Sequence, residues 1–600
     1  MITPHRLPAL GLFALVPVAL GMLAGCAAPP SAPPAEPVRL RVIGFNDFHG
    51  NLETTSQTLT LPDPAKPGAT QRVAVGGAAP MAGLIAALRA GSPHSLVISA
   101  GDMVGAAPMV STLFRHESTI EVMNRIGVDV GTPGNHEFDA GTAELKRLVG
   151  GGCAANDLGQ PSTSCALQPR YAGARFPLVV ANVEGPDGQP LFAPSWVTQV
   201  GPVKVGVIGA VTRGTPNIVV PSGVAGLRFT DEAEAINRAA RALKGQGVNT
   251  LIVTMHEGGE IGSAQQPGDW NDDSCPNLRG PIVALAQRIT PDVDLIISGH
   301  SHQGYRCKID GRYVVQSTSY GRGLSATDLV IDPRSGAVDR SATRSRNLPI
   351  LHAGTDAAQR AALLAAEPPP WGDALRKAQA APEVAQQVGL FTTAAAPRTQ
   401  RVVGQIGGSF ERGRGGNSAG SSAGQMIADA QLAATRDAAR GGAQFALMNI
   451  GGVRADLLCA QTPPCPVTFG QAFTMQPFGN SLVVMSFTGT ELKALLESQH
   501  PPGRSTAYLL QASASLSYRW LAKAEFGQRV QDLRVNGQAV QPDAEYRVTV
   551  NSFLAEGGDG LTLLKTGRQR IGGMLDVDAL VEHLRSTPVP QSGGRITVVD

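Results

Sequence analysis

The strongest constraint on the fold of this 600-residue sequence is an alternation, within residues 38–330, of short apolar runs and helix-like segments. The apolar runs have the length of buried strands and are bounded by glycine or polar turns, at residues 39–45, 95–100, 176–181, 203–208, 249–254, 293–297 and 313–316. Apolar residues at three- and four-residue spacing predict helices between several of these runs, at residues 79–90, 118–126, 231–243 and 280–289. This alternation predicts an α/β fold, with helices layered on sheets.

Residues with metal-binding side chains directly follow several of the predicted strands. They lie in segments 46–50, 101–102, 134–139, 256–259 and 298–302, which together hold five of the eleven histidines. Ligands of α/β sheets bind beyond the carboxyl ends of the strands, so we expect these segments to converge on one pocket. Each segment taken singly is typical of a turn or a helix start. Their combination is what indicates a site.

Seven side chains in these segments form a candidate donor set of two carboxylates, four imidazoles and one carboxamide, without a thiolate: Asp47, Asp102, His49, His256, His300, His302 and Asn135. Oxygen and nitrogen donors of this kind suit zinc, manganese, cobalt or iron better than calcium. Seven donors exceed the needs of one tetrahedral site, and a carboxylate can bridge two ions roughly 3.5–4 Å apart, as in two-metal hydrolases that act on phosphoryl groups. We therefore expect two divalent metal ions as cofactors, with Asp102 as the bridging ligand.

In sequence order, five blocks resemble the motifs of the calcineurin-like metallophosphoesterases: Asp47-x-His49, Gly101-Asp102, Gly134-Asn135-His136-Glu137, His256 and Gly299-His300-x-His302. The resemblance implies that residues 38–350 form a four-layer α/β/β/α sandwich. It assigns one metal ion to Asp47, His49, Asp102 and His302, and the other to Asp102, Asn135, His256 and His300. Some relatives have glutamine at the position of His302, a change of donor type that keeps the coordinating role.

His136 and Asp139 resemble the catalytic pair of the same family. In the mechanism that the resemblance implies, a metal-bound hydroxide attacks phosphorus in line, and His136 stabilises the transition state or the leaving oxygen. Asp139 is spaced to hold the imidazole in one tautomer. His136 is then a catalytic residue and not a metal ligand. The alternative is that His136 only caps the following helix.

A second domain is expected beyond an alanine-rich helical linker at residues 351–400, which contains Pro368-Pro369-Pro370. Residues 401–600 have their own pattern, with predicted helices at 425–435 and 489–499 and predicted strands at 445–449, 482–487, 509–518 and 546–550. This region is expected to fold separately as an α+β substrate-binding domain.

Segments 449–454, 476–480 and 551–560 resemble the C-terminal domain of the 5′-nucleotidase and UDP-sugar hydrolase family. The resemblance implies that Phe478 and Phe553 stack on the two faces of a base, an arrangement that tolerates different bases. It also implies that Asp559 accepts hydrogen bonds from the ribose hydroxyls, and that Asn449 and Arg454 contact the ring or the phosphate. In the family a further arginine precedes the first helix of this domain, and the resemblance assigns it to Arg414, with Arg412 as the alternative. The sequence departs from the family nearby, since serine stands within residues 415–424 where relatives often have glutamate.

The N-terminus has the pattern of an export signal followed by a spacer. Residues 1–25 combine an early Arg6 with an apolar run, and Leu23-Ala24-Gly25-Cys26 resembles a bacterial lipobox, in which the cysteine is lipidated. An ordinary signal peptide with an incidental cysteine is the alternative. Residues 26–37 are rich in proline and suit an extended tether. We expect an exported protein, periplasmic or at the cell surface, that contacts a bacterial membrane only through a lipid on Cys26.

Six cysteines remain after Cys26, and an even number suits an oxidising compartment. Six cysteines allow 15 connectivities. Proximity in the sequence favours three pairs among them: Cys153 with Cys165, Cys275 with Cys307, and Cys459 with Cys465.

Taken together, these patterns predict a hydrolase that acts on nucleotides. A formal net charge of +2 gives no excess that would favour a nucleic acid polymer as partner. We expect hydrolysis of nucleoside 5′-monophosphates, with a nucleotide-sugar or NAD pyrophosphatase and a 2′,3′-cyclic nucleotide phosphodiesterase as alternatives. A surface lipoprotein that binds nucleotides without catalysis is the alternative from another class. The intact set of metal donors argues against it.

Overall fold

The computed structural model describes residues 36–54, 57–66, 68–155, 163–262, 269–413, 420–502, 507–585 and 594–599. The expected signal peptide, the lipidation site Cys26, most of the tether and Arg414 lie outside these residues. Within the described part of the chain, none of the helices combines the length and the apolar character needed to cross a membrane.

The N-terminal half contains two sheets that pack face to face. The first has the strand order β15-β14-β1-β4-β5, comprising Arg344–Pro349, Gly323–Ile331, Val38–Phe45, His94–Ser99 and Val130–Gly131. The second has the order β12-β13-β11-β10-β8-β7, comprising Gly304–Ile309, Arg312–Ser317, Leu295–Ser298, Thr250–His256, Val203–Val211 and Ser195–Val200. β1 runs parallel to β4, and β10 runs parallel to β8 and β11, so the carboxyl ends of these strands share one edge in each sheet.

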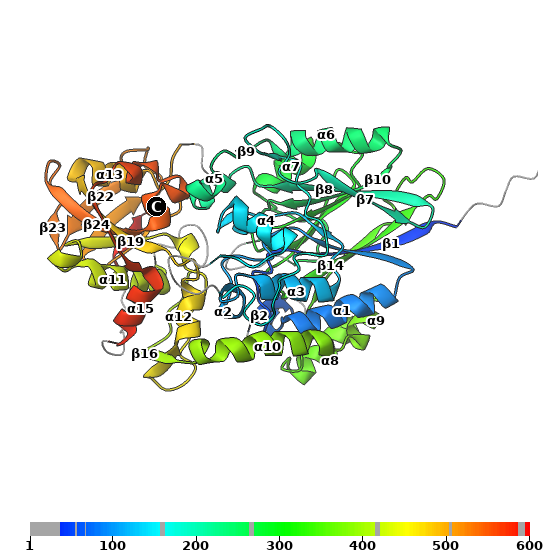
Figure 1. Ribbon diagram of the computed structural model, residues 1–600, viewed down its shortest axis with the longest axis horizontal. Helices are drawn as coiled ribbons and strands as arrows, with labels where there is room; N and C mark the ends of the chain where they lie inside the picture. Colours follow the sequence, from blue (N-terminus) through cyan, green and yellow to red (C-terminus); the bar gives the residue numbers. More distant parts are fainter. Residues whose placement is uncertain are drawn as a thin grey trace, which may run out of the picture. The chain divides into compact units, whose positions relative to one another are not determined.

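Helices cover the outer faces of the two sheets (Figure 1). α1 (Ala78–Ala90) and α3 (Glu117–Ile126) pack against the first sheet, and α6 (Glu232–Gly245) and α7 (Pro281–Arg288) against the second. Between the sheets lies an apolar layer that includes Val42, Ile98, Val207, Ile252 and Val315. These layers confirm the expected α/β/β/α sandwich. Because the central strands are buried on both faces, they appear in the sequence as continuous apolar runs.

The strand predicted at residues 176–181 does not form. Only a bridge between Gly131 and Leu178 is present there. The Val179 amide donates to the Gly131 carbonyl (2.9 Å), whereas the Ala181 amide donates to the Gly209 carbonyl (2.8 Å). The segment therefore passes from the edge of the first sheet to the second sheet, and it pairs with neither over the length of a strand.

Three helices follow the sandwich: α8 (Ala357–Ala366), α9 (Trp371–Lys377) and α10 (Pro382–Thr399). They are packed onto the N-terminal half, because Trp371, Val384 and Phe391 join the apolar layer outside the first sheet. The ring of Phe391 lies 5.1 Å from that of Phe114, centroid to centroid. The segment predicted as a linker is thus an integral part of the helical layer next to α1 and α3.

The C-terminal half is a mixed α/β region with its own core. One sheet has the order β20-β17-β24-β19-β25, comprising Gln511–Ala512, Phe445–Met448, Glu545–Asn551, Ser481–Thr488 and Arg568–Leu575. A second sheet, β23-β22-β21-β26, comprises Gln538–Ala539, Val530–Val535, Leu516–Leu521 and Ile596–Val599. The main helices are α11 (Ser422–Thr435), α12 (Phe469–Met475), α13 (Gly489–Glu497) and α15 (Asp576–Arg585). A separate apolar core that includes Phe487, Leu492 and Trp520 confirms the expected second domain.

The strand predicted at residues 509–518 is divided between these two sheets. β20 pairs with β17, and β21 pairs with β22 and β26. Between them the Leu516 amide donates to the Ser513 carbonyl (3.0 Å), which closes a turn. A segment with an extended pattern in the sequence therefore contributes to two sheets instead of forming one strand.

The structure contains three disulfides among the described residues: Cys153–Cys165, Cys275–Cys307 and Cys459–Cys465. Their Cα atoms lie 5.6, 5.5 and 5.5 Å apart. These are the pairs that proximity in the sequence favours.

Candidate active site

Five strands of the sandwich deliver the predicted metal ligands to one place. Asp47 and His49 follow β1, Asp102 follows β4, Asn135 follows β5, His256 ends β10, and His300 and His302 follow β11. Three donor groups have their ligand atoms within 4.8 Å of one another: Asp47 with His49 and His302, Asp47 with Asp102 and His256, and His49 with Asp102 and His136. The convergence expected from the sequence is therefore present, although Asp47 and His302 lie at opposite ends of the domain's sequence.

The shortest contacts in this cluster join imidazole and carboxylate atoms. His256 Nε2 lies 3.0 Å from Asp102 Oδ2, and His302 Nε2 lies 3.2 Å from Asp47 Oδ1. His49 Nε2 lies 3.1 Å from His302 Nε2. Two imidazole nitrogens that face each other at this distance are a natural pair of ligands for one cation.

Orphaned polar atoms support a metal in this cluster. Asn135 Oδ1 and His256 Nε2 are buried without a hydrogen bond of regular geometry from the described residues, and the one close neighbour of His256 Nε2 is the Asp102 carboxylate, itself a candidate metal donor. Buried polar atoms are almost always paired, so both atoms indicate a partner of another kind. A divalent cation fits the oxygen and nitrogen donors that surround them.

His300 is the member of the predicted set that stands slightly apart. Its backbone amide donates to Asp47 Oδ2 (3.0 Å), and its ring lies 5.2 Å from the His256 ring. It belongs to none of the three-donor groups formed by the described residues. The structure thus places His300 beside the cluster, where its role as a ligand remains a prediction.

Hydrogen bonds orient two of the imidazoles. His49 Nδ1 bonds to the Gly105 carbonyl (2.9 Å), and His256 Nδ1 bonds to the Ala100 carbonyl (2.7 Å). Because each Nδ1 donates to a carbonyl, each Nε2 is left to face the cluster with its lone pair. The tautomer suited to a metal ligand is therefore set by the backbone.

The backbone is strained where it carries these ligands. The φ angles of Asp47, His49, Asp102, His300 and His302 are +50°, +48°, +51°, +71° and +58°. Non-glycine residues in this left-handed region cost of order 1–3 kcal/mol each, and such strain clusters at functional sites. Gly134 is required for another reason, since a Cβ there would lie 2.1 Å from Asp102 Oδ1.

Glu137 holds the loop that carries Asp102, a role that was not predicted from the sequence. Its carboxylate accepts hydrogen bonds from the amides of Asp102 (2.9 Å), Met103 (2.8 Å) and Gly134 (2.5 Å). Burial, assisted by the nearby charge of Asp102, raises the pKa of Glu137 to about 7. The sequence signal that could have indicated this role is the place of Glu137 in the Gly134-Asn135-His136-Glu137 block.

The charges of the cluster shift the pKa of Asp47 and His256 in opposite directions. Burial alone would raise the pKa of Asp47, but the charges of His302 and His256 outweigh it and lower the pKa to about 2. Burial alone would lower the pKa of His256, but Asp102 and Asp47 outweigh it and raise the pKa to about 10. The cluster thus favours anionic carboxylates next to a positive charge.

His136 and Asp139 form the expected pair. His136 Nδ1 lies 2.7 Å from Asp139 Oδ2, and the His136 amide donates to Asp102 Oδ1 (2.9 Å). Burial lowers the pKa of His136, but the charges of Asp139 and Asp102 outweigh it and raise the pKa. With Nδ1 engaged by Asp139, Nε2 is the atom available at the cluster.

The C-terminal half reaches the cluster through Phe478 and Arg454. The rings of Phe478 and His136 are stacked, with centroids 5.7 Å apart and planes at 22°. The Arg454 guanidinium lies 5.9 Å from the centre of the Phe478 ring. Arg454 is also close enough to His49, His136 and His302 for its charge to oppose protonation of each, which acts to lower their pKa values. Positive charge from one half of the chain therefore faces the metal-binding cluster of the other.

Arg412, the alternative to Arg414, lies next to Arg454. Its Nη1 donates to the Arg454 carbonyl (3.2 Å). Arg412 Nε and Arg454 Nε and Nη2 are buried without a hydrogen-bond partner among the described residues. Buried guanidinium nitrogens of this kind are suited to an anion such as a phosphate.

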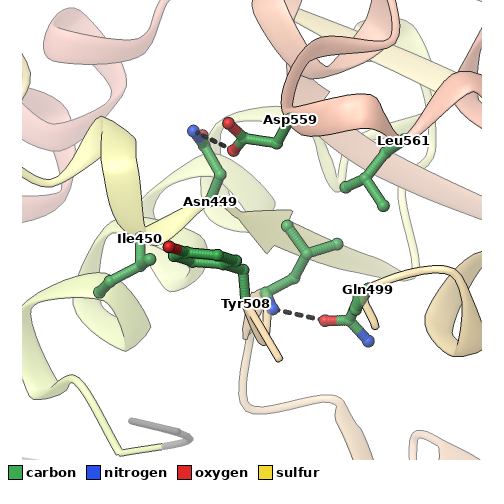
Figure 2. A pocket seen from close by; sticks show the side chains of 7 residues that line it. Asn449, Ile450, Gln499, Tyr508, Asp559 and Leu561 are labelled. Carbon is green, nitrogen blue, oxygen red and sulfur yellow. Dashed lines mark hydrogen bonds between the residues drawn. The ribbon is translucent and has the colours of Figure 1, made fainter. Parts of the chain in front are cut away.

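A pocket in the C-terminal half contains two of the predicted substrate residues (Figure 2). Asn449 Nδ2 donates to Asp559 Oδ2 (3.0 Å), and Asn551 Nδ2 donates to Asn449 Oδ1 (3.0 Å). The lining consists of Asn449, Ile450, Gln499, Tyr508, Leu510, Asp559 and Leu561. Figure 2 shows the Tyr508 ring below the Asn449–Asp559 pair.

Phe478 and Phe553 do not line this pocket. The Phe553 ring instead packs against Gly558, where a Cβ would lie 2.4 Å from its Cζ. Tyr508 is the aromatic side chain that the pocket does contain, and no motif in the sequence singled it out. It is 49% exposed and directly precedes the apolar run that predicted a strand at residues 509–518.

Two family models match the chain. One, described as calcineurin-like phosphoesterase, matches residues 40–304, and the other, 5′-nucleotidase, C-terminal domain, matches residues 400–566. Among solved structures, a 5′-nucleotidase precursor from Thermus thermophilus has 26% identity and a TM-score of 0.70, covering 94% of this chain and 99% of the other.

Curated relatives align over more than nine-tenths of the chain. They are the endonuclease YhcR of Bacillus subtilis (30% identity over 93% of this chain), the cell wall protein Lmo0130 of Listeria monocytogenes (29% over 92%) and a probable 5′-nucleotidase of Treponema pallidum (28% over 91%). The chain spans 40%, 67% and 92% of their respective lengths.

Proposed function

The chain belongs to the family of calcineurin-like phosphoesterases with a 5′-nucleotidase C-terminal domain, and on this premise we propose that it hydrolyses nucleoside 5′-monophosphates to nucleoside and phosphate. Enzymes of this family are metal-dependent phosphoric monoester hydrolases. The observation that carries the proposal is the meeting of three features: a cluster of carboxylate and imidazole donors, the His136–Asp139 pair beside it, and Arg454 facing both. A phosphomonoester is an anion that needs positive charge on several sides.

Two divalent ions would be held by Asp47, His49, Asp102 and His302 at one position and by Asp102, Asn135, His256 and His300 at the other. Bound there, they would neutralise charge on the phosphoryl oxygens and lower the pKa of the attacking water. The carbonyls of Gly105 and Ala100 keep the imidazoles of His49 and His256 in the ligating tautomer. Glu137 fixes the backbone of Asp102 through its amide hydrogen bonds.

His136 would act on the oxygen that leaves with the nucleoside. Asp139 accepts a hydrogen bond from His136 Nδ1–H and stabilises the imidazolium form, so that Nε2 carries a proton toward the leaving oxygen or the transition state. The Phe478 ring covers one face of the imidazole and limits its rotation.

The nucleoside would be bound by residues of the C-terminal half. Asp559 and Asn449 offer hydrogen-bond partners for ribose and base, and Tyr508 offers an aromatic face beside them. Arg454 and Arg412 would bind the phosphate, with Phe478 and Phe553 as the predicted stacking partners of the base. Recognition and chemistry would then use different halves of the chain.

We place this activity outside the cytoplasm, with the protein anchored through a lipid on Cys26. The disulfides and the name of the relative from Listeria monocytogenes, a cell wall protein, support this location.

A substrate panel tests the proposal. Phosphate release and product identity are measured with AMP, UDP-glucose, NAD and 2′,3′-cyclic AMP, in the presence of zinc, manganese, cobalt or iron. Adenosine and phosphate from AMP, at a rate above that of the other substrates, are expected. Faster cleavage of UDP-glucose, NAD or the cyclic nucleotide would replace the proposed substrate. Metal-free, inactive protein that still binds adenosine would identify a binding lipoprotein instead.

A further inference from the structure

Tyr320 packs against the metal-binding cluster, although no motif in the sequence marked it. It is in the loop between β13 and β14, and its amide donates to the Asp47 carbonyl (2.6 Å). Its ring centroid lies 5.5 Å from that of His49 and 5.1 Å from that of His302. Tyr320 therefore packs directly on two predicted ligands of the same metal ion.

The loop holds the ring in a strained and well-defined position. Tyr320 has a φ of +60°, a conformation that a bulky residue rarely adopts. The Arg322 guanidinium lies 5.4 Å from the ring centre, and hydrogen bonds to the Ser319 carbonyl (3.0 Å) and Ser319 Oγ (2.7 Å) fix it there. Strain of this kind, maintained by its surroundings, indicates a functional constraint.

The hydroxyl of Tyr320 is buried, and its O–H has no hydrogen-bond acceptor among the described residues. The guanidinium groups of Arg454 and Arg412 lie close enough to this phenol for their charges to act on it. These are the two arginines whose buried nitrogens also lack partners among the described residues. Three side chains with unsatisfied hydrogen-bond donors therefore stand in one place, between the metal-binding cluster and the C-terminal half.

We propose that the Tyr320 hydroxyl donates a hydrogen bond to a non-bridging phosphoryl oxygen, completing an anion site with Arg412 and Arg454. This inference rests on the proposed function, because the phosphate of the substrate is the anion. A purely aromatic role, with the ring packing on His49 and His302, would need no hydroxyl. The two roles differ by a single oxygen atom, so Tyr320→Phe separates them.

The test compares wild type, Tyr320→Phe and the matched control Tyr313→Phe as metal-loaded full-length proteins. Tyr313 lies on β13, and its hydroxyl accepts from Arg306 Nη1 (3.3 Å) away from the cluster. Binding of inorganic phosphate is measured by calorimetry, and kcat and KM are measured with AMP. Metal content and thermal unfolding show whether each variant is folded and loaded.

Tyr320→Phe is expected to weaken phosphate binding and to lower kcat/KM roughly 10- to 100-fold, as for a lost hydrogen bond to a charged group, with unchanged metal content. Tyr313→Phe should match wild type in both measurements. Unchanged phosphate affinity in Tyr320→Phe would overturn the inference. If wild type fails to hydrolyse AMP, the proposed function fails, but phosphate binding still decides the role of Tyr320.

Discussion

The metal-binding end and the nucleoside end of the candidate site are built differently. Asp47, His49 and His256 are fully buried, and backbone groups orient their side chains. Tyr508, at the nucleoside end, is about half exposed, and Asn449 and Asp559 bond to each other in an open pocket. The comparison shows a donor cluster that the backbone preorganises, as the proposed bond cleavage would require, and a more exposed pocket, as the proposed nucleoside recognition would allow.

Loss of Asp102 should have the largest effect. Its carboxylate contacts His49 and His256 and takes part in two of the three donor groups. Asp102→Ala is expected to remove bound metal and to reduce phosphate release to background, as measured by metal analysis and a phosphate assay. Asp129→Asn, which alters a carboxylate paired with Arg89 away from the cluster, is the control. Full metal content in Asp102→Ala would show that the cluster does not depend on this residue.

His136→Ala should have the next largest effect, and it should separate catalysis from metal binding. Removing a general acid typically costs roughly 10²–10⁴-fold in rate, so kcat is expected to fall by that factor. Metal content should stay at the wild-type level, because Nδ1 of His136 is held by Asp139. Steady-state kinetics and metal analysis check both statements. Loss of metal in this variant would make His136 a ligand, as its place in one donor group allows.

Tyr508→Leu should affect the nucleoside end alone. Stacking on an aromatic side chain contributes about 1–3 kcal/mol per base, so KM for AMP is expected to rise roughly 10-fold. Ribose 5-phosphate, which lacks a base, should show no change, and Tyr508→Phe should behave like wild type. Phe526→Leu is the matched control, since Phe526 is also 49% exposed. Equal KM changes with both substrates would mean that Tyr508 does not contact the base.

Asp576→Asn should have the smallest effect on activity and a visible effect on stability. Asp576 begins α15, and its amide donates to the carbonyl of Asn480, two residues after Phe478. Burial raises the pKa of Asp576 to about 7, from an ordinary value near 3.8. The folded state therefore binds this proton more tightly than the unfolded state. The free energy of unfolding of the wild-type protein should fall as pH rises from about 4 to 7 and should level off above that range.

The asparagine of Asp576→Asn mimics the protonated carboxyl, so the variant should not show this fall in the free energy of unfolding with rising pH. Relative to wild type, the variant should gain stability with increasing pH, by roughly a few kcal/mol at pH 8. Thermal unfolding at pH 4 and pH 8 measures the difference. A constant difference between the two proteins across this range would contradict the raised pKa.

Much of the N-terminal half could be predicted because its strands are buried on both faces. Such strands appear as uninterrupted apolar runs. The residues that follow β1, β4, β10 and β11 are polar because ligands of α/β sheets bind beyond the carboxyl ends of the strands. Prediction of strands from the local sequence pattern was wrong where a segment divides its backbone hydrogen bonds between two sheets. Residues 176–181 pass between two sheets, and residues 509–518 contribute to two sheets through a turn.

The sequence by itself determined the layered fold, the candidate metal donors that converge in it and the order of the two halves, since residue type and periodicity along the chain carry that information. Only the tertiary structure decided that Tyr320 lies near Arg412 and Arg454, that Glu137 supports the Asp102 loop, and that Tyr508 lines a pocket with Asn449 and Asp559. These are ordinary residues whose role comes from neighbours distant in the sequence. For Tyr320 the mark of such a role is a buried O–H without an acceptor among the described residues, and this exists only once the chain is folded.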